Sequence, residues 1–291
     1  MNPQELIQEG KLVDALAALQ EQVRKDAANP KYRIFLFQLL CVLGQWNRAL
    51  TQLNVAGELD ATNLPMVQTY REAIQCEALR VAIFSGARAP LIFGQPRPWL
   101  ALLLEALKAD AAGDADRAAG ARAQAFELAP ARGGSVDGQR FEWLADADQR
   151  LGPVLEALVN GRYFWIPLQR ISRIELDAPV DLRDAVWTPA SFTWTNGAQT
   201  VGLIPTRYNG TVGAGAIGGN ADNALLLARR TEWVGEGAGQ GLGQRMLVSD
   251  AGDHALMDVR VIEFDATSDD EDDIVSDESN AGATGLEASH G

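Results

Sequence analysis

Apolar side chains recur at helical spacing over the first part of the chain. The first apolar face ends before Asn29-Pro30, a combination that stops one helix and can start another. Similar patterns predict further helices over residues 32–42, 46–56 and 64–84. The first face is made by Leu12, Ala15, Leu16, Leu19 and Val23.

These helices repeat with a fixed period. Gly44 stands 34 residues after Gly10, and each glycine is followed five residues later by an alanine, Ala15 and Ala49. That spacing is the tetratricopeptide period, in which small residues let two helices approach closely and each pair packs on the next. A weaker third copy follows over residues 100–130. The pattern favours a helical repeat with a binding groove, and an unrelated helix bundle is the alternative.

The pattern changes to short β-branched and aromatic runs after residue 133. Strands are predicted over residues 163–167, 171–176, 190–195, 200–205, 245–249 and 254–264. Asn196-Gly197 predicts a hairpin turn between two of them. One helix is predicted within this part, because Leu151, Val154, Leu155, Leu158 and Val159 share a helical face that ends at Asn160-Gly161.

The sequence therefore predicts an α+β fold in three parts. Residues 1–131 form a tetratricopeptide-like helical domain, residues 132–264 a small antiparallel β-rich domain, and residues 265–291 an acidic tail. The tail contains nine acidic residues and no Lys or Arg, so the net charge of −14 leaves about −5 for the rest of the chain. With few large apolar residues, the tail is expected to be disordered.

Charge and hydropathy narrow the classes of function. There is no basic stripe of the kind that binds nucleic acid. No apolar run is long enough to span a membrane, and Glu5 and Glu9 stand where a secretory signal would be basic. A cytoplasmic protein without a membrane partner is expected. Cys41 and Cys76 fall inside apolar helical patterns and are expected to be buried thiols, so neither a disulfide framework nor a thiolate metal site is predicted.

Catalytic chemistry has few candidates. The two histidines are His254 and His290, too few for a His-rich metal centre, and no Ser-His-Asp arrangement is predicted around them. The best carboxylate cluster is Glu142, Asp146 and Asp148, which as an acid-base pair or a Mg²⁺ or Ca²⁺ site would make a metal-dependent hydrolase. The preferred interpretation is structural: Asp148 caps the predicted helix and pairs with Arg150 or Arg162.

Glycine-rich stretches at residues 210–219 and 235–243 are predicted to be flexible loops. The second one leads through Gln244-Arg245 into a predicted strand, whereas a phosphate cradle needs a following helix.

Large side chains on the inner helices are candidates for binding a partner helix. Tyr32, Phe35, Leu39 and Trp46 are expected to contribute anchors in a helical groove. Core packing is the alternative for each of them.

Several strings in the predicted β-rich domain, and one upstream of it, resemble the ImpE/SciE family, also called TagJ. The longest is Phe141-Glu142-Trp143-Leu144-Ala145-Asp146-Ala147-Asp148. The resemblance extends to about Phe264 and leaves out the tail. The other strings are residues 94–101, 150–156, 160–163, 165–167, 181–184, 187–189, 203–208, 231–233 and 241–245.

The resemblance implies an accessory protein of bacterial type VI secretion. It implies binding to the N-terminal helix of the small sheath subunit, of the TssB/VipA type, and a role in sheath assembly or disassembly, alongside the ClpV-type ATPase. It supplies no catalytic residue and no cofactor, so a non-enzymatic adaptor is expected. A scaffold or chaperone for another secretion component is the alternative with a different ligand.

Overall fold

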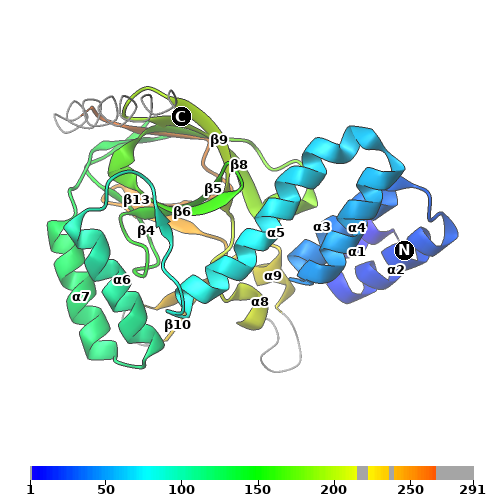
Figure 1. Ribbon diagram of the computed structural model, residues 1–291, viewed down its shortest axis with the longest axis horizontal. Helices are drawn as coiled ribbons and strands as arrows, with labels where there is room; N and C mark the ends of the chain where they lie inside the picture. The colour runs from blue at the N-terminus through cyan, green and yellow to red at the C-terminus, as the bar shows by residue number, and fades with distance from the viewer. Residues whose placement is uncertain (1, 215–221, 236–238, 267–291) are drawn as a thin grey trace, which may run out of the picture.

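The structure, a computed structural model, describes residues 2–214, 222–235 and 239–266 (Figure 1). Helices dominate as far as Leu128 and strands from Gly134 onward. This is the predicted α+β fold. Most of the predicted tail, residues 267–291, lies outside the described residues, as do residues 215–221 and 236–238 of the two glycine-rich stretches. Asp265 is described, and its carboxylate pairs with Arg140.

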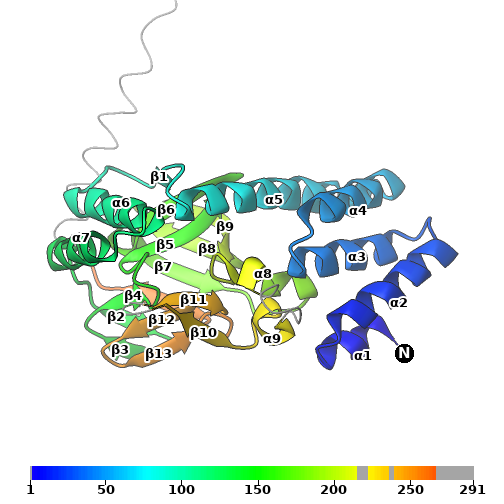
Figure 2. The ribbon, with the colours of Figure 1, turned by 90° about the horizontal axis from the view of Figure 1, so that it is seen from below.

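The first helices form antiparallel pairs that stack on one another (Figure 2). Gly10 and Gly44 have φ angles of 76° and 67°, the left-handed backbone that the tight turn of each pair requires. Asn29 caps the third helix, because its side chain accepts a hydrogen bond from the backbone of Lys31. The helices are α1 (Pro3–Gln8), α2 (Leu12–Lys25), α3 (Pro30–Val42), α4 (Trp46–Leu59), η1 (Ala61–Asn63) and α5 (Leu64–Phe84).

The predicted third copy forms a helical hairpin, but it does not extend this stack. Helices α6 (Pro98–Ala111) and α7 (Ala115–Leu128) lie at the opposite end of the molecule from α1–α4, and α5 runs between the two groups (Figures 1 and 2). The connection from α5 to α6 includes strand β1 (Leu91–Ile92), which pairs with the sheet. The chain therefore joins the edge of the sheet at β1 before α6 begins.

The strands of the described residues make one large sheet and two small ones. The large sheet has the order β1-β6-β5-β9-β8-β7-β14-β2-β3, and the smaller ones are β10-β11 and β13-β12-β4. Neighbours are antiparallel except β1 and β6. The bounds are β2 (Gly134–Val136), β3 (Gln139–Phe141), β4 (Leu144–Asp146), β5 (Val154–Val159), β6 (Arg162–Pro167), η2 (Leu168–Arg170), β7 (Ile171–Leu176), η3 (Leu182–Ala185), β8 (Trp187–Trp194), β9 (Gln199–Pro205), α8 (Thr211–Ala214), α9 (Asn223–Leu226), β10 (Thr231–Val234), β11 (Gln240–Gly243), β12 (Met246–Ser249), β13 (Gly252–Ala255) and β14 (Val261–Phe264).

The predicted helix around Leu155 is wrong, because this segment is strand β5. Val154 and Leu158 face the core beneath the helices, whereas Leu155, Ala157 and Val159 face a second core on the other side of the sheet. A strand buried on both faces has no alternation of apolar and polar residues, so its pattern cannot be told from that of a buried helix. Asn160-Gly161 turns the β5–β6 hairpin and does not end a helix.

The predicted strand over residues 254–264 is also divided in the structure. Its first residues belong to β13 and its last to β14, and these strands lie in different sheets. Leu256 and Val259 are buried in the segment between them, so they look like strand positions in the sequence although the chain turns there. The hairpin predicted at Asn196-Gly197 is confirmed, and it joins β8 to β9.

A buried ion network joins α5 to the sheet. Glu156, on the face of β5 that meets the helices, is fully buried and accepts hydrogen bonds from Arg80 Nε at 2.7 Å and from Arg245. Arg80 also contacts Glu77 Oε2 at 3.0 Å, and Arg245 contacts Asp146. Two arginines thus satisfy three carboxylates from α5, β5 and β4.

Burial and the neighbouring arginines shift the pKa values of two carboxylates in this network, Glu156 and Asp146. Burial alone would raise the pKa of Glu156, but the charges of Arg80 and Arg245 outweigh burial and lower the pKa from 4.5 to about 2. For Asp146, burial outweighs the attraction of Arg245 and raises the pKa from 3.8 to about 7. The two groups therefore change stability in opposite directions as the pH falls.

Substituting Glu156 tests this network. We expect Glu156→Gln to lower the free energy of unfolding by about 3–5 kcal/mol at pH 7, because two buried guanidinium groups lose their shared partner. Urea denaturation measures the change. Glu175→Gln, which removes an exposed partner of Arg173, is the matched control and should cost less than about 1 kcal/mol. Equal losses in the two variants would contradict a structural role for the network.

The lowered pKa of Glu156 also predicts how the stability of wild type and Glu156→Gln depends on pH. The folded-state pKa of Glu156 is below its unfolded value, so its contribution is complete above about pH 4.5 and is lost as the pH falls towards about 2. Wild type should therefore lose on the order of 3 kcal/mol more than Glu156→Gln across this range. Asp146 is present in both proteins, so the comparison removes the part of its opposite effect that does not depend on Glu156. Parallel stability curves would contradict the lowered pKa.

Candidate functional site

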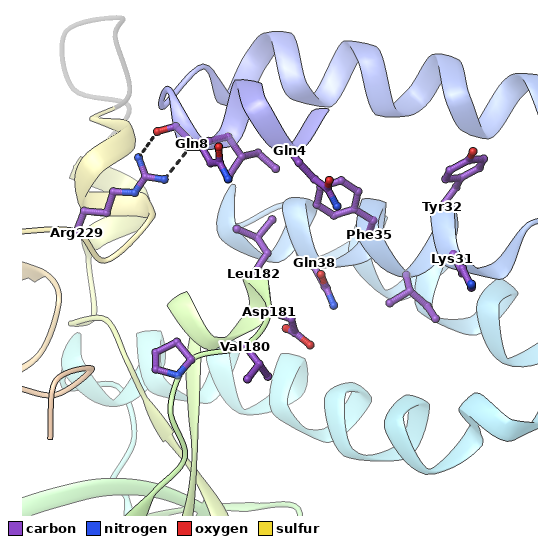
Figure 3. Close-up of a pocket in the computed structure, with 13 residues that line it drawn as sticks. Gln4, Gln8, Lys31, Tyr32, Phe35, Gln38, Val180, Asp181, Leu182 and Arg229 are labelled. Carbon is purple, nitrogen blue, oxygen red and sulfur yellow. Dashed lines mark hydrogen bonds between the residues drawn. The ribbon is translucent and has the colours of Figure 1, made fainter. Parts of the chain in front are cut away.

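An open groove of ≈ 950 Å³ lies between the stacked helices and a loop of the β-rich part (Figure 3). One wall comes from α1 and α3, and the other comes from the segment that leads into η3. The side chain of Arg229, which follows α9, closes one end. The lining residues are Gln4, Ile7, Gln8, Lys31, Tyr32, Ile34, Phe35, Gln38, Pro179, Val180, Asp181, Leu182 and Arg229.

The helical wall has an apolar centre. Tyr32 and Phe35 are three residues apart on α3, so they lie on the same side of the helix, and both are partly exposed. Each also packs against the core beneath the helices. The core therefore holds these two side chains in place, and their exposed parts give the groove an aromatic surface.

The opposite wall is held in place by a carboxylate. Asp184 Oδ2 accepts hydrogen bonds from the backbone N–H groups of Val180 at 2.8 Å and Asp181 at 2.9 Å. Asp181 in turn accepts from the backbone of Arg183, which completes a capping box at the start of η3. Leu182 packs against the core beneath the helices, and η3 packs against α3.

The α1 end of the helical wall is held by α9 and by Arg229, which follows it. Arg229 donates hydrogen bonds to the backbone carbonyls of Gln8 at 2.8 Å and Ile7 at 3.0 Å, as Figure 3 shows. Asn223 Nδ2 donates to the carbonyl of Gly10 at 2.6 Å. These carbonyls lie at the C-terminal end of α1, where free acceptors need partners. The position of α1 therefore depends on residues more than 200 positions away.

The four predicted anchors lie in three different environments. Tyr32 and Phe35 line the groove. Leu39 is 0% exposed and belongs to the core, so in this structure its side chain cannot contact a ligand. Trp46 lines a different cleft with Tyr208 and Val212, and its ring lies 5.9 Å from that of Trp187.

The predicted carboxylate cluster does not converge on one point. Asp146 contacts Arg245 and accepts a hydrogen bond from the Tyr208 hydroxyl at 2.9 Å. Asp148 pairs with Arg150 at 2.5 Å, which confirms the predicted pairing. Its predicted role as a helix cap is wrong, since no helix follows. Glu142 is exposed, and within residues 2–214, 222–235 and 239–266 no three His, Cys, Asp or Glu side chains form a group that could hold a metal ion.

His254 lies in strand β13 and contacts the turn of the β12–β13 hairpin. Its Nε2 atom lies 3.2 Å from Ser249 Oγ, and that hydroxyl also donates to the carbonyl of Gly252 at 3.1 Å. The Ser249 hydroxyl is thus tied to the β12–β13 hairpin. In the described part of the chain, no helix has the length and apolar character to cross a membrane.

No local pattern in the sequence indicates that Val180, Leu182 and Arg229 contribute to the site. The string at residues 181–184 was part of the family resemblance, but nothing in it indicated a wall of a groove. Helical spacing identifies neighbours on α3, whereas contacts between α1 and residue 229 depend on the tertiary fold.

The sequence and the fold both match known proteins. Residues 138–263 match the ImpE protein family, and residues 6–74 match the tetratricopeptide repeat. A crystal structure of protein VPA1032 from Vibrio parahaemolyticus has the same fold, with a TM-score of 0.79 over 92% of this chain and 98% of that one, at 22% identity.

A close relative in sequence shows the family. The type VI secretion system accessory component TagJ of Pseudomonas aeruginosa is 53% identical over 267 residues, which cover 92% of each chain. The resemblance noted in the sequence is therefore confirmed, and so is the repeat in the first part of the chain. The chain belongs to the ImpE (TagJ) family of type VI secretion system accessory proteins.

Proposed function

We propose that this protein is a non-enzymatic adaptor of type VI secretion that binds the N-terminal helix of the small sheath subunit in the groove between α1, α3 and residues 179–182. The observation that carries the proposal is the partly exposed aromatic pair Tyr32 and Phe35 in an open groove of ≈ 950 Å³. The 53% identical relative that is named a type VI secretion system accessory component supports a role in type VI secretion. The protein acts in the cytoplasm, in sheath assembly or disassembly alongside the ClpV-type ATPase.

The dimensions suit one helix. With 13 residues, α3 is roughly 20 Å long, which is enough to contact about four turns of a ligand helix. An amphipathic helix binds such a groove through apolar residues at positions i, i+3 or i+4, and i+7. Tyr32 and Phe35 are the proposed anchors on the protein side, because aromatic residues dominate the energy of many interfaces.

The anchors can be tested by calorimetric titration. The ligand is a peptide that covers the first helix of the small sheath subunit from the same genome, and the protein is the full chain. We expect Tyr32→Ala and Phe35→Ala each to weaken binding by about 2 kcal/mol or more, since a few residues carry most of the affinity. Circular dichroism and urea denaturation establish that each variant is folded.

Two other variants serve as controls in this titration. Val13 on α2 is 74% exposed and lies outside the groove lining, so Val13→Ala should bind like wild type. Trp46→Ala alters the separate cleft and should also leave the affinity unchanged. Loss of affinity with Trp46→Ala but not with Phe35→Ala would place the ligand in the other cleft. A folded wild-type protein that fails to bind the peptide would overturn the proposed ligand.

The metal-dependent hydrolase is the alternative of a different class. Because Asp146 and Asp148 already have arginine partners, we expect Mg²⁺, Ca²⁺ and Mn²⁺ to leave the unfolding temperature unchanged at millimolar concentration. A bound ion would raise this temperature by mass action. A metal-dependent rise that disappears in Asp146→Asn would support the hydrolase.

A further inference from the structure

The groove is built from two parts of the chain that are about 150 residues apart, α3 and the segment before η3. We propose that the ligand helix is held between these two walls, so that Val180 contacts the ligand and the ligand has apolar side chains on two adjacent sides. This inference rests on the proposed function and adds to it the second wall and the form of the ligand.

Val180 has the properties of a binding residue. Val180 is 86% exposed, the highest exposure among the large apolar residues of the described part of the chain. An exposed valine adds little to folding, because its apolar surface remains in water. It lines the groove together with Tyr32 and Phe35. Contact with an apolar ligand would remove this surface from water.

The backbone beneath Val180 is fixed, so the side chain has a defined position. Its N–H group is bound by Asp184 Oδ2, and Asp184 is itself only 4% exposed. Pro179 before it has a restricted φ angle. Leu182, two residues further on, packs into the core. A side chain on such an anchored loop can bind with little loss of backbone entropy.

Two walls require a particular kind of helix. A helix on a flat surface needs one apolar stripe, whereas a helix between two walls needs apolar residues over a wider arc. One row of side chains would meet Tyr32 and Phe35 on α3, and a neighbouring row would meet Val180. The side away from both walls stays in water and carries polar residues.

The charged residues of the groove also favour a ligand helix of a particular charge. Asp181 is paired with Arg183 at 2.7 Å, and Arg229 is bound to backbone carbonyls. Lys31 is exposed, and the structure gives it no ion pair with any carboxylate of the described residues. The lining thus has an excess of positive charge in a chain whose net charge is −14. A ligand helix with a carboxylate near Lys31 fits this surface.

The test compares two exposed valines. Val180→Ser removes the proposed contact, and Val201→Ser is the matched control, because Val201 is 74% exposed on β9 and lies outside the groove lining. Serine is uncharged, so neither change alters the attraction of a charged ligand. The full-length proteins are titrated with the peptide of the first helix of the small sheath subunit. Urea denaturation should give both variants the stability of wild type within about 0.5 kcal/mol.

We expect Val180→Ser to weaken binding at least about fivefold and Val201→Ser to change it less than about twofold. If Val180→Ser binds like wild type while Tyr32→Ala and Phe35→Ala do not, the second wall is not part of the site and only this inference fails. Equal weakening in both serine variants also overturns it. If wild type itself does not bind, the proposed function fails, and this inference fails with it.

Discussion

The ion network around Glu156 is the constraint on which the rest of the structure depends. Arg80 brings α5 to β5, and Arg245 brings the β11–β12 region to the same carboxylate. Removing two charges from water is expensive, so the arrangement is stable only when every partner is in place. Because α5 packs against α4 and the sheet holds η3, this point fixes how the stacked helices face the loop at Val180.

The groove follows from that relation between the two parts. The stack supplies Tyr32 and Phe35, and the sheet supplies the loop before η3 and, through the segment after α9, Arg229. A third guanidinium strengthens the same junction: Arg207 donates to the carbonyls of Val42 at 2.8 Å and Leu226 at 2.7 Å, which lie at the ends of α3 and α9. The site is therefore a product of the junction, and neither part alone contains it.

The sequence predicted the repeated elements well because their signals are local. Gly10, Gly44 and the apolar spacing between them depend on neighbouring residues only, and so does the turn at Asn196-Gly197. Strand β5 was missed because both of its faces are buried, which removes the alternation that identifies a strand. Two of the four predicted anchors, Tyr32 and Phe35, line the groove, and their spacing on α3 is visible in the sequence. The wall at Val180 depends on hydrogen bonds to Asp184 and on packing across the junction, which no local pattern records.

In the proposed complex, a ligand helix binds between the stack and the loop before η3. Hydrogen exchange of the full-length protein, with and without the peptide of the first sheath-subunit helix, tests it most directly, because local protection reports which segments are covered. The account predicts slower exchange in residues 3–8, 30–38 and 177–182, with no change in α6 and α7. Protection confined to α6 and α7, or to the stack without residues 177–182, would contradict it.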